Sequence, residues 1–423
     1  MSRIAVVGAG WAGLSAAVHA VEGGHDVHVV EMGHQPGGRA RSDHTARGRL
    51  DNGQHILIGA YRETLSLLRH VGVDIERSLT RSSLGLRFPD GSGFCIPEGP
   101  PTWAFARGAM SAHHWPARDR WALLRTALGW RFSGFRCDST WSVRQLCRGL
   151  PDSVLRDLVE PLCVAALNTP MSSACAQTFL RVLRDALFGG PHSADLLLPK
   201  VPLADLLPNP TMNWLRSRGA TVHLGHRVMR LVESAGQWHV DNSAFDAVVL
   251  AVTAREAARL VAPINAEWSR QAAALYYQPI VTVWLDEPKL QWRTPMMMFR
   301  SGEQAPAQFA FSMAELGGPR GRFTWVVSAA QDWLEQGDLR TTTQAVLAQA
   351  RASFPGAFRA EGAVHHASVE RRATFACLPG LQRPAANVAQ RLWAAGDYVE
   401  GPYPSTLEGA VQSGRRAAAR LDL

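Results

Sequence analysis

The sequence predicts an α/β protein, α+β overall, in which a Rossmann-type nucleotide-binding domain is joined to a second domain of mixed sheet and helices. Three observations carry this prediction. The first residues place a buried strand before a glycine-rich turn. The chain has 423 residues, about three times the usual domain length. Its 46% hydrophobic and 19% charged residues are a globular balance, which excludes a disordered chain.

The N-terminal segment has the parts of a dinucleotide-binding motif in the expected order. A strand-like run at 4–7 leads into Gly8-Ala9-Gly10-Trp11-Ala12-Gly13, and helical residues 14–20 follow. A second strand at 26–30 ends at Glu31. An acid at this spacing is placed to accept hydrogen bonds from ribose hydroxyls.

Each glycine of the turn has its own physical purpose. Gly8 makes the tight turn, Gly10 lets the backbone approach a pyrophosphate, and Gly13 lets helix and strand pack closely. The amides that open the helix, at Trp11 and Ala12, bring donors and a partial positive charge to the phosphates.

Later segments distinguish among dinucleotides. Gly37-Gly38-Arg39 follows the acid closely, and a nicotinamide dehydrogenase has no reason to place a second glycine pair and an arginine there. Near the C-terminus, a strand-like run ends in Gly396-Asp397, and a helix rich in small residues begins at Thr406-Leu407. In this order the segments resemble the flavin-containing amine oxidase and phytoene desaturase superfamily.

The resemblance implies an amine-oxidase-like fold with FAD as the cofactor. In that superfamily the arginine contacts phosphate, the C-terminal acid contacts the ribityl or phosphate region, and the last helix begins beside the flavin pyrimidine. A valine in mid-chain contacts the adenine through its backbone. Carried over to this chain, these positions are Gly38, Arg39, Val228, Gly396, Asp397, Thr406 and Leu407.

The resemblance also implies a discontinuous domain organisation. We expect the FAD-binding domain to comprise residues 1–85, 195–260 and 385–423. The substrate-binding domain then comprises residues 86–194 and 261–384. Strand-like runs between residues 280 and 328 predict a sheet in this second domain, and helical periodicity dominates its first part.

The segment 101–136 combines seven large aromatic residues with six arginines and a single acid, Asp119. Its apolar side chains fall on one helical face: Ala117, Trp121, Leu124, Leu128 and Phe132. Two interpretations are open. A basic, aromatic-faced helix can lie in the membrane interface, and the same stripe can pack into a protein core.

Charge and cysteine content limit the partners and the compartment. The formal net charge of +8 permits nucleic acid, anionic membrane or acidic ligands. No zinc-finger spacing or RNA-binding signature is present, so we expect no nucleic-acid partner and no metal site. The six cysteines include no CxxC pair and predict reduced thiols in a cytoplasmic protein. Peripheral contact with the inner face of the cytoplasmic membrane stays open.

A more specific resemblance concerns the reaction. Residues 50–59 (LDNGQHILIG), 161–170 and 396–406 are similar to the squalene-associated FAD-dependent desaturases, the hydroxysqualene dehydroxylases. This resemblance implies that reduced flavin delivers hydride from N5 to hydroxysqualene, or a similar long isoprenoid, and forms squalene for hopanoid biosynthesis. It also implies an electron donor that the sequence does not identify.

Such a reaction needs an acid for the leaving hydroxyl and stabilisation of an allylic cation. His55 follows a segment expected near the flavin and is the candidate acid, with a structural role as the alternative. Asp51 and Glu400 are weaker candidates. Aromatic faces stabilise cations, so Tyr398 and Tyr403, beside the C-terminal motif, are the other catalytic candidates.

Three other functions compete with this interpretation. A carotenoid-type desaturase would use a similar site in the oxidative direction. An amine oxidase commonly needs a lysine near flavin N5, and neither Lys200 nor Lys289 lies in a matching segment. A prenyl carrier resembling the GDP-dissociation inhibitors would bind lipid without flavin, and the intact nucleotide motif argues against it.

Overall fold

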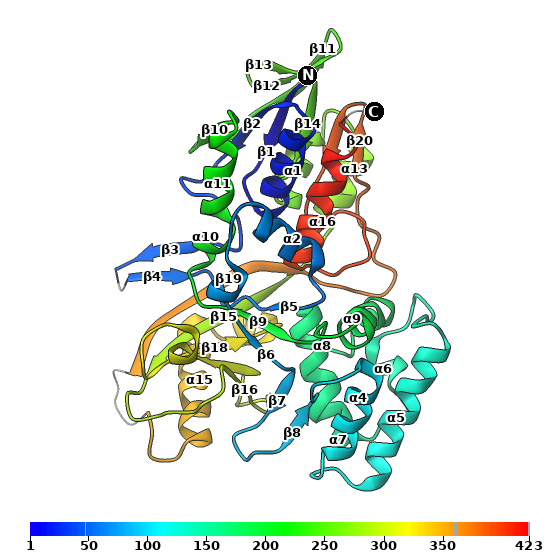
Figure 1. Ribbon diagram of the computed structural model, residues 1–423, viewed down its shortest axis with the longest axis vertical. Helices are drawn as coiled ribbons and strands as arrows, with labels where there is room; N and C mark the ends of the chain where they lie inside the picture. Colours follow the sequence, from blue (N-terminus) through cyan, green and yellow to red (C-terminus); the bar gives the residue numbers. More distant parts are fainter. Residues whose placement is uncertain (47, 359–362, 422–423) are drawn as a thin grey trace.

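A six-stranded sheet organises the upper part of the molecule (Figure 1). The computed structural model describes residues 1–46, 48–358 and 363–421. Neighbouring strands of this sheet pair in parallel, except at its last strand. Their order is β10 (Thr221–Leu224), β2 (Asp26–Glu31), β1 (Arg3–Val7), β14 (Ala247–Leu250), β21 (Leu392–Ala394) and β20 (Asn387–Ala389).

Helices α1 (Trp11–Glu22) and α16 (Leu407–Ala418) pack beside this sheet. They cross each other so closely that their backbones are in contact. A Cβ atom at Gly414 would lie 2.0 Å from the carbonyl oxygen of Ala12. The Ser15 hydroxyl donates a 2.8 Å hydrogen bond to the carbonyl of Val411. Two helices from distant parts of the sequence are therefore packed together against the six-stranded sheet.

A buried carboxylate ties α16 to α2 (Arg62–His70). Glu408 accepts hydrogen bonds from the backbone amides of Glu63 and Thr64 and from the Thr64 hydroxyl. Because α2 has no side-chain cap of its own, Glu408 caps its first turn from another helix.

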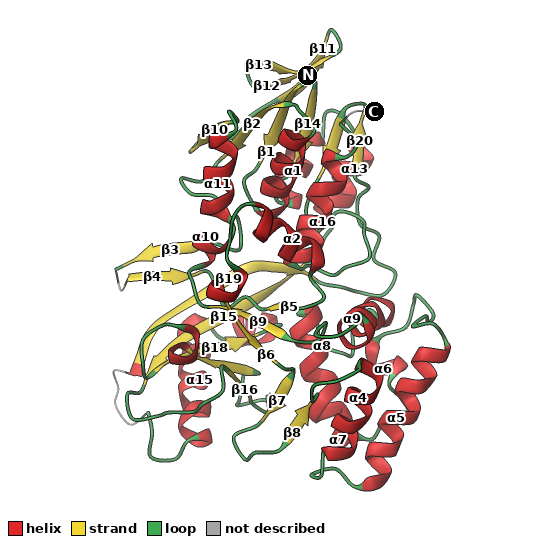
Figure 2. Cartoon of the chain, viewed as in Figure 1, coloured by secondary structure: helices red, strands yellow, loops and turns green. Residues whose placement is uncertain are grey.

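An antiparallel five-stranded sheet organises the lower part (Figure 2). Its order is β16 (Met296–Met298), β17 (Phe309–Ser312), β18 (Arg322–Val327), β15 (Tyr277–Asp286) and β19 (Val364–Phe375). Helix α15 (Leu339–Ser353) packs against it. The strands predicted between residues 280 and 328 and the α/β class with a mixed second part are confirmed.

Smaller elements join these layers. The minor sheets comprise β3 (Ser42–Thr45) with β4 (Gly48–Asp51), β5 (Leu57–Ile58) with β9 (Leu196–Pro199) and β6 (Leu79–Ser82), β7 (Gly85–Arg87) with β8 (Gly93–Cys95), and β11 (Leu231–Ser234) with β12 (Gln237–Val240) and β13 (Ser243–Phe245). The remaining helices include α4 (Pro101–Ser111), α5 (Ala117–Phe132), α8 (Glu160–Leu167), α9 (Ala176–Phe188), α11 (Pro208–Ser217), α12 (Ala254–Val261) and α13 (Ala266–Ala273).

Helix α5 turns its apolar stripe outward. Trp121, Leu128 and Phe132 are exposed, whereas Leu123 and Ala127 are buried. Of the five side chains in the predicted stripe, Leu124 is half-buried against the core and the other four are exposed. Among the helices within the described ranges, none combines the length and the apolar character needed to cross a bilayer.

The domain boundaries stay a prediction. One helix assigned to the second domain, α13, packs on α12 beside the six-stranded sheet (Figure 1). The Trp268 indole of α13 donates a 2.8 Å hydrogen bond to the carbonyl of Ala385.

We predict that Gly414→Ala destabilises the protein by about 1–3 kcal/mol, because the added methyl group overlaps the α1 backbone. Gly129→Ala is the matched control: this glycine also lies in a helix, and a Cβ there meets no atom within 4 Å. We expect the control to be neutral or stabilising by up to about 1 kcal/mol. Denaturant unfolding of both variants measures the difference, and equal stabilities would contradict the close crossing.

Candidate functional site

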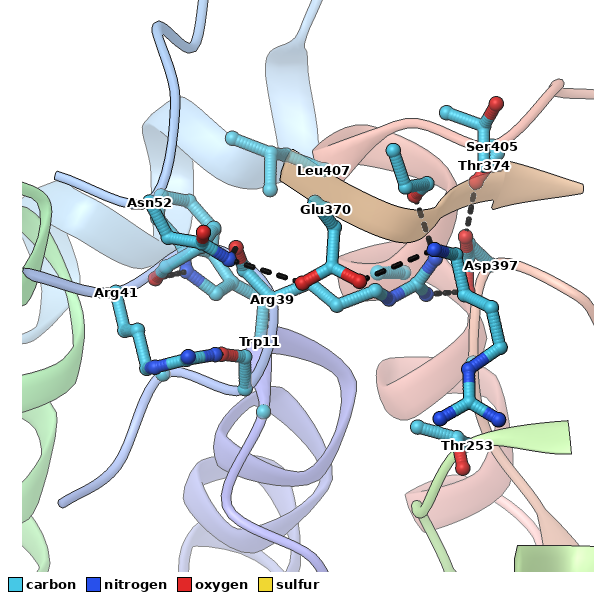
Figure 3. Close-up of a pocket in the computed structure, with 18 of the residues that line it drawn as sticks. Trp11, Arg39, Arg41, Asn52, Thr253, Glu370, Thr374, Asp397, Ser405 and Leu407 are labelled. Carbon is cyan, nitrogen blue, oxygen red and sulfur yellow. Dashed lines mark hydrogen bonds and ion pairs between the residues drawn. The ribbon is translucent and has the colours of Figure 1, made fainter. Parts of the chain in front are cut away.

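A cavity of about 890 Å³ extends from the carboxyl edge of the six-stranded sheet to the five-stranded sheet. Its upper wall is formed by the glycine-rich turn, the end of β2 and the start of α16. Its lower wall is formed by residues 52–56, α8, β15, β17, β18 and β19. Figure 3 shows side chains from both walls facing one another. Ligands of open parallel sheets bind at this edge.

The three glycines of the first turn meet different surroundings. Gly8 has a φ of +107°, and a Cβ there would lie 2.4 Å from the carbonyl oxygen of Ala251. A Cβ at Gly13 would lie 1.9 Å from the carbonyl oxygen of Gly8. At Gly10 the nearest atom is the Gly38 Cα, 3.9 Å away. Gly8 and Gly13 are thus required by the fold, whereas Gly10 leaves room in the cavity.

The N-terminus of α1 has the features of an anion-binding site. No side chain caps it, and its first turn contains no acid. Gly10, Trp11 and Ala12 line the cavity there, and the Trp11 indole is held by a hydrogen bond to the Ala40 carbonyl. Uncapped amides and the helix dipole together favour a phosphate group at this position.

Glu31 is fixed in the cavity wall by two backbone amides. Its Oε2 accepts from the Ala9 amide at 2.6 Å, and its Oε1 accepts from the Gly33 amide at 2.7 Å. A carboxylate oxygen has two lone pairs, so each oxygen can accept a further hydrogen bond from a hydroxyl.

Arg39 and Asp397, predicted from opposite ends of the chain, form an ion pair in the cavity (Figure 3). Arg39 Nη2 lies 2.5 Å from Asp397 Oδ1, and Nη1 donates to the carbonyl of Ala373 at 2.8 Å. The Ser405 hydroxyl donates to the other Asp397 oxygen. Burial, the largest single effect, opposes the Arg39 charge, but Asp397, Tyr277 and Glu370 together outweigh it, and the pKa of Arg39 is raised.

The predicted cofactor positions converge on this cavity. Gly13 packs behind the turn, and the remaining positions line the cavity wall: Gly8, Gly10, Trp11, Ala12, Glu31, Gly38, Arg39, Val228, Gly396, Asp397, Thr406 and Leu407. The Thr406 hydroxyl caps α16 by accepting from the Gly409 amide at 3.0 Å. The assignment of these residues to particular atoms of a cofactor stays a proposal.

His55 lines the cavity but is poorly suited to donate a proton. Burial, the largest effect, lowers its pKa below the ordinary value of 6.5, so the imidazole is neutral at pH 7. Its Nδ1 lies 3.2 Å from the carbonyl oxygen of Gly53. That oxygen can only accept, which assigns the hydrogen to Nδ1 and leaves Nε2 as an acceptor.

The two tyrosines predicted to face the reacting centre lie outside the cavity. Tyr398 is buried against the edge of Trp268, and its hydroxyl has no hydrogen-bond partner in the described part of the chain. Tyr403 donates a 2.7 Å hydrogen bond to Asp185 on α9. Neither side chain is among those that line the cavity, and their catalytic assignment stays a prediction.

The weaker acid candidates also lie elsewhere. Asp51 accepts hydrogen bonds from the Ser42 hydroxyl and the Leu203 amide, behind the cavity wall. Glu400 is exposed and is not among the residues that line the cavity.

Two other tyrosines, Tyr61 and Tyr277, do line the cavity. Burial, the largest effect, raises the pKa of Tyr277 to about 12 and also raises that of Tyr61. Both phenols therefore keep their protons at neutral pH. Tyr61 lies two residues after the end of the LDNGQHILIG segment, and this proximity is a signal for its position. Nothing in the sequence around Tyr277 distinguishes it from its neighbour Tyr276.

The lower wall of the cavity is largely apolar and aromatic. The side chains that give it this character are Ile56, Val164, Ile280, Phe309, Phe311 and Val326. Polar side chains line the same wall, among them Asn52, His55, Asn168, Arg372 and Glu370. Glu370 accepts a 3.1 Å hydrogen bond from the Asn52 amide group (Figure 3). Neither lysine of the chain lines the cavity, and the Lys200 ammonium donates to the Glu76 carbonyl instead.

Comparison with known proteins agrees with this site. The model of the flavin containing amine oxidoreductases matches residues 11–422. A hydroxysqualene dehydroxylase from Sinorhizobium fredii is 28% identical, over 98% of this chain and 97% of its own length. A 15-cis-phytoene desaturase from Glycine max is 23% identical, over 99% of this chain and 79% of its own length.

The fold also matches a solved structure. An oxidoreductase from Methanosarcina mazei superposes with a TM-score of 0.76 at 15% identity, covering 99% of this chain and 100% of that protein. The predicted amine-oxidase-like fold is therefore confirmed.

We predict that Gly10→Ala leaves the apoprotein as stable as the parent chain but strongly lowers its FAD content. The added methyl group clashes with no atom of the described residues, since the nearest, the Gly38 Cα, is 3.9 Å away, and it occupies volume that a phosphate needs. Gly13→Ala is the contrasting variant and should lose both stability and FAD, because its Cβ overlaps the Gly8 backbone. The ratio of flavin to protein absorbance and the thermal unfolding of the apoproteins measure both effects. Normal flavin content in Gly10→Ala would contradict phosphate binding at this turn.

Proposed function

The chain belongs to the family of flavin containing amine oxidoreductases, and from this premise we propose that it converts hydroxysqualene to squalene by reductive dehydroxylation. It is an FAD-dependent oxidoreductase. The observation that carries the proposal is that one cavity joins a wall suited to a nucleotide to a wall with a cluster of apolar and aromatic side chains and no lysine. The hydroxysqualene dehydroxylase relative, matched over nearly its full length, supports this choice of substrate.

The upper wall would hold the cofactor. The uncapped amides of α1 suit the pyrophosphate, and the free lone pairs of Glu31 suit the adenosine ribose. Val228, whose carbonyl already accepts from Arg259, lies where the adenine would pack. The ribityl chain and the flavin ring would lie at the other end of this wall. There they would contact the ion pair of Arg39 with Asp397 and the start of α16 at Leu407.

The lower wall would hold the isoprenoid. Burial of an apolar chain contributes about 25 cal/mol per Å² removed from water, and Phe309, Phe311 and Val326 offer such a surface. Because this wall lies across the same cavity as the flavin site, a bound chain would place its reacting carbon beside the cofactor.

The reaction replaces a C–O bond with a C–H bond and releases water. Reduced FAD, when bound, supplies the hydride and is left oxidised by two electrons. The protein supplies the proton that leaves with the hydroxyl group. Tyr277 is the proposed donor, because its phenol is protonated at neutral pH and faces the cavity.

Departure of the hydroxyl group develops positive charge on an allylic carbon. The faces of Phe309 and Phe311 would stabilise this charge, and the apolar wall would exclude water that could capture it. The Arg39 charge does not oppose it strongly, since Asp397 pairs with the guanidinium.

The phytoene desaturase relatives favour a second candidate, in which the same cavity oxidises an isoprenoid. The lack of lysine in the cavity argues against amine oxidation by the usual arrangement. Because the chain belongs to a family of flavin enzymes, we do not retain the hypothesis of a prenyl carrier that binds lipid without flavin.

We predict that hydroxysqualene reoxidises the anaerobically reduced protein and yields one squalene per flavin. Absorbance reports the flavin, and mass spectrometry of the extract reports the product. Phytoene added to the oxidised protein is the control, and we expect no flavin reduction from it. If reduced flavin persists with hydroxysqualene intact while phytoene is desaturated, the second candidate is correct.

We predict that Tyr277→Phe lowers the rate of flavin reoxidation by about 100-fold, the usual contribution of a positioned acid, with normal flavin content. Tyr276→Phe is the matched control, since this neighbour is half exposed and lies outside the cavity.

The pH profile separates Tyr277 from His55. A donor with a pKa of about 12 keeps its proton throughout pH 6–9, so we expect a flat rate there. A histidine donor with a pKa below 6.5 would lose its proton, and the rate would fall as the pH rises through that value. A falling profile that persists in Tyr277→Phe and disappears in His55→Gln would return the assignment to His55.

A further inference from the structure

Helices α4 and α5 present an apolar surface that is left uncovered by the residues the structure describes. Five of the ten large hydrophobic side chains exposed in the described part of the chain belong to these two helices. They are Trp103, Met110, Trp121, Leu128 and Phe132, which together define the α4–α5 face. Trp103 is 72% exposed, Trp121 61% and Phe132 82%.

The periodicity of α5 shows that this exposure is a property of one side of the helix. At 100° per residue, positions 121, 125, 128 and 132 fall within a sector of about 60°. The buried residues Asp119, Leu123 and Ala127 point the opposite way. The helix therefore packs through one side and turns Trp121, Leu128 and Phe132 outward.

Contacts between the two helices join their exposed sides into one surface. The Arg120 guanidinium donates a 2.6 Å hydrogen bond to the carbonyl of Met110. At the other end Arg131 lies 3.4 Å from the Thr102 hydroxyl. The helices thus run antiparallel side by side, as Figure 1 shows at the lower right, with Trp103 near the Phe132 end.

The surroundings of this face are strongly basic. Exposed arginines flank the apolar side chains at positions 107, 118, 125, 131 and 136. The single acid of the segment, Asp119, is buried and accepts a 2.6 Å hydrogen bond from the Ser153 hydroxyl. Exposed cations around exposed aromatic side chains match a surface with phosphate groups above hydrocarbon.

We propose that the α4–α5 face docks the protein on the surface of an anionic phospholipid bilayer. The aromatic and aliphatic side chains enter the boundary between headgroups and acyl chains, and the arginines bind lipid phosphates. This proposal goes beyond the proposed function, since it does not depend on which substrate the cavity accepts.

The test is cosedimentation of the purified holoprotein with sucrose-loaded vesicles. Vesicles of phosphatidylcholine alone are compared with vesicles that also contain phosphatidylglycerol. We expect binding to the mixed vesicles, weaker binding to neutral ones, and weakening of the former with added salt. Equal affinity for the two compositions would overturn the proposal.

Two variants locate the binding surface. The double substitution Trp121→Ala/Phe132→Ala should lower affinity for the mixed vesicles by about tenfold or more. Arg125→Glu, at a side chain with no ion-pair partner among the described residues, should lower it by about fivefold or more. Because these side chains are exposed, flavin content and thermal stability should stay unchanged.

The double substitution Met229→Ala/Arg230→Glu is the matched control. It removes one exposed apolar side chain and reverses one exposed charge at the other end of the molecule. It should bind vesicles like the parent chain. Undiminished binding of both α4–α5 variants would overturn the proposal. Light scattering that shows a dimer, made monomeric by Trp121→Ala/Phe132→Ala, would assign the face to a second copy of the chain instead.

Discussion

The backbone contact between α1 and α16 is the constraint on which the site depends. Because Gly414 has no side chain, α16 can approach α1 until its backbone lies against the Ala12 carbonyl. The Ser15 hydroxyl of α1 then donates a hydrogen bond to the Val411 carbonyl of α16. As a result, two helix N-termini from opposite ends of the chain meet the same cavity. Glu408 extends the arrangement to α2, which follows the cavity loop at 52–56. A shift of α16 would therefore displace this end of the cavity, the proposed flavin end, together with the loop.

The electrostatic design of the cavity follows from the same packing. The carboxylates of Glu31, Asp397 and Glu370 are each held by donors of the protein, two backbone amides in the case of Glu31. The first turn of α1, in contrast, has neither a side-chain cap nor an acid. Negative groups of the protein are thus satisfied internally, and positive potential is left for an anionic ligand.

Local patterns predicted the nucleotide-binding wall well, because its parts are contiguous in sequence. The glycine turn, the acid after β2 and the start of α16 are all of this kind. The pairing of Arg39 with Asp397 joins residues 358 positions apart, so no local pattern indicates it. Tyr277 was missed for a related reason: which side of β15 faces the cavity depends on its register with β19, and that register shifts between Gln278 and Ile280. Periodicity likewise identified the stripe on α5 but not the direction in which it points.

The closure of the six-stranded sheet has a consequence for the order of folding. Strand β21 and helix α16 come late in the described chain, and the Ser15 hydroxyl meets the Val411 carbonyl only across 396 positions of sequence. The six-stranded sheet therefore joins segments that are far apart in the chain. Contacts of such long range make folding slow, and the small-residue face of α1 stays uncovered until α16 has been synthesised. A nascent chain that still lacks α16 also lacks the part of the cavity wall that this helix supplies, so it cannot yet form the complete cavity.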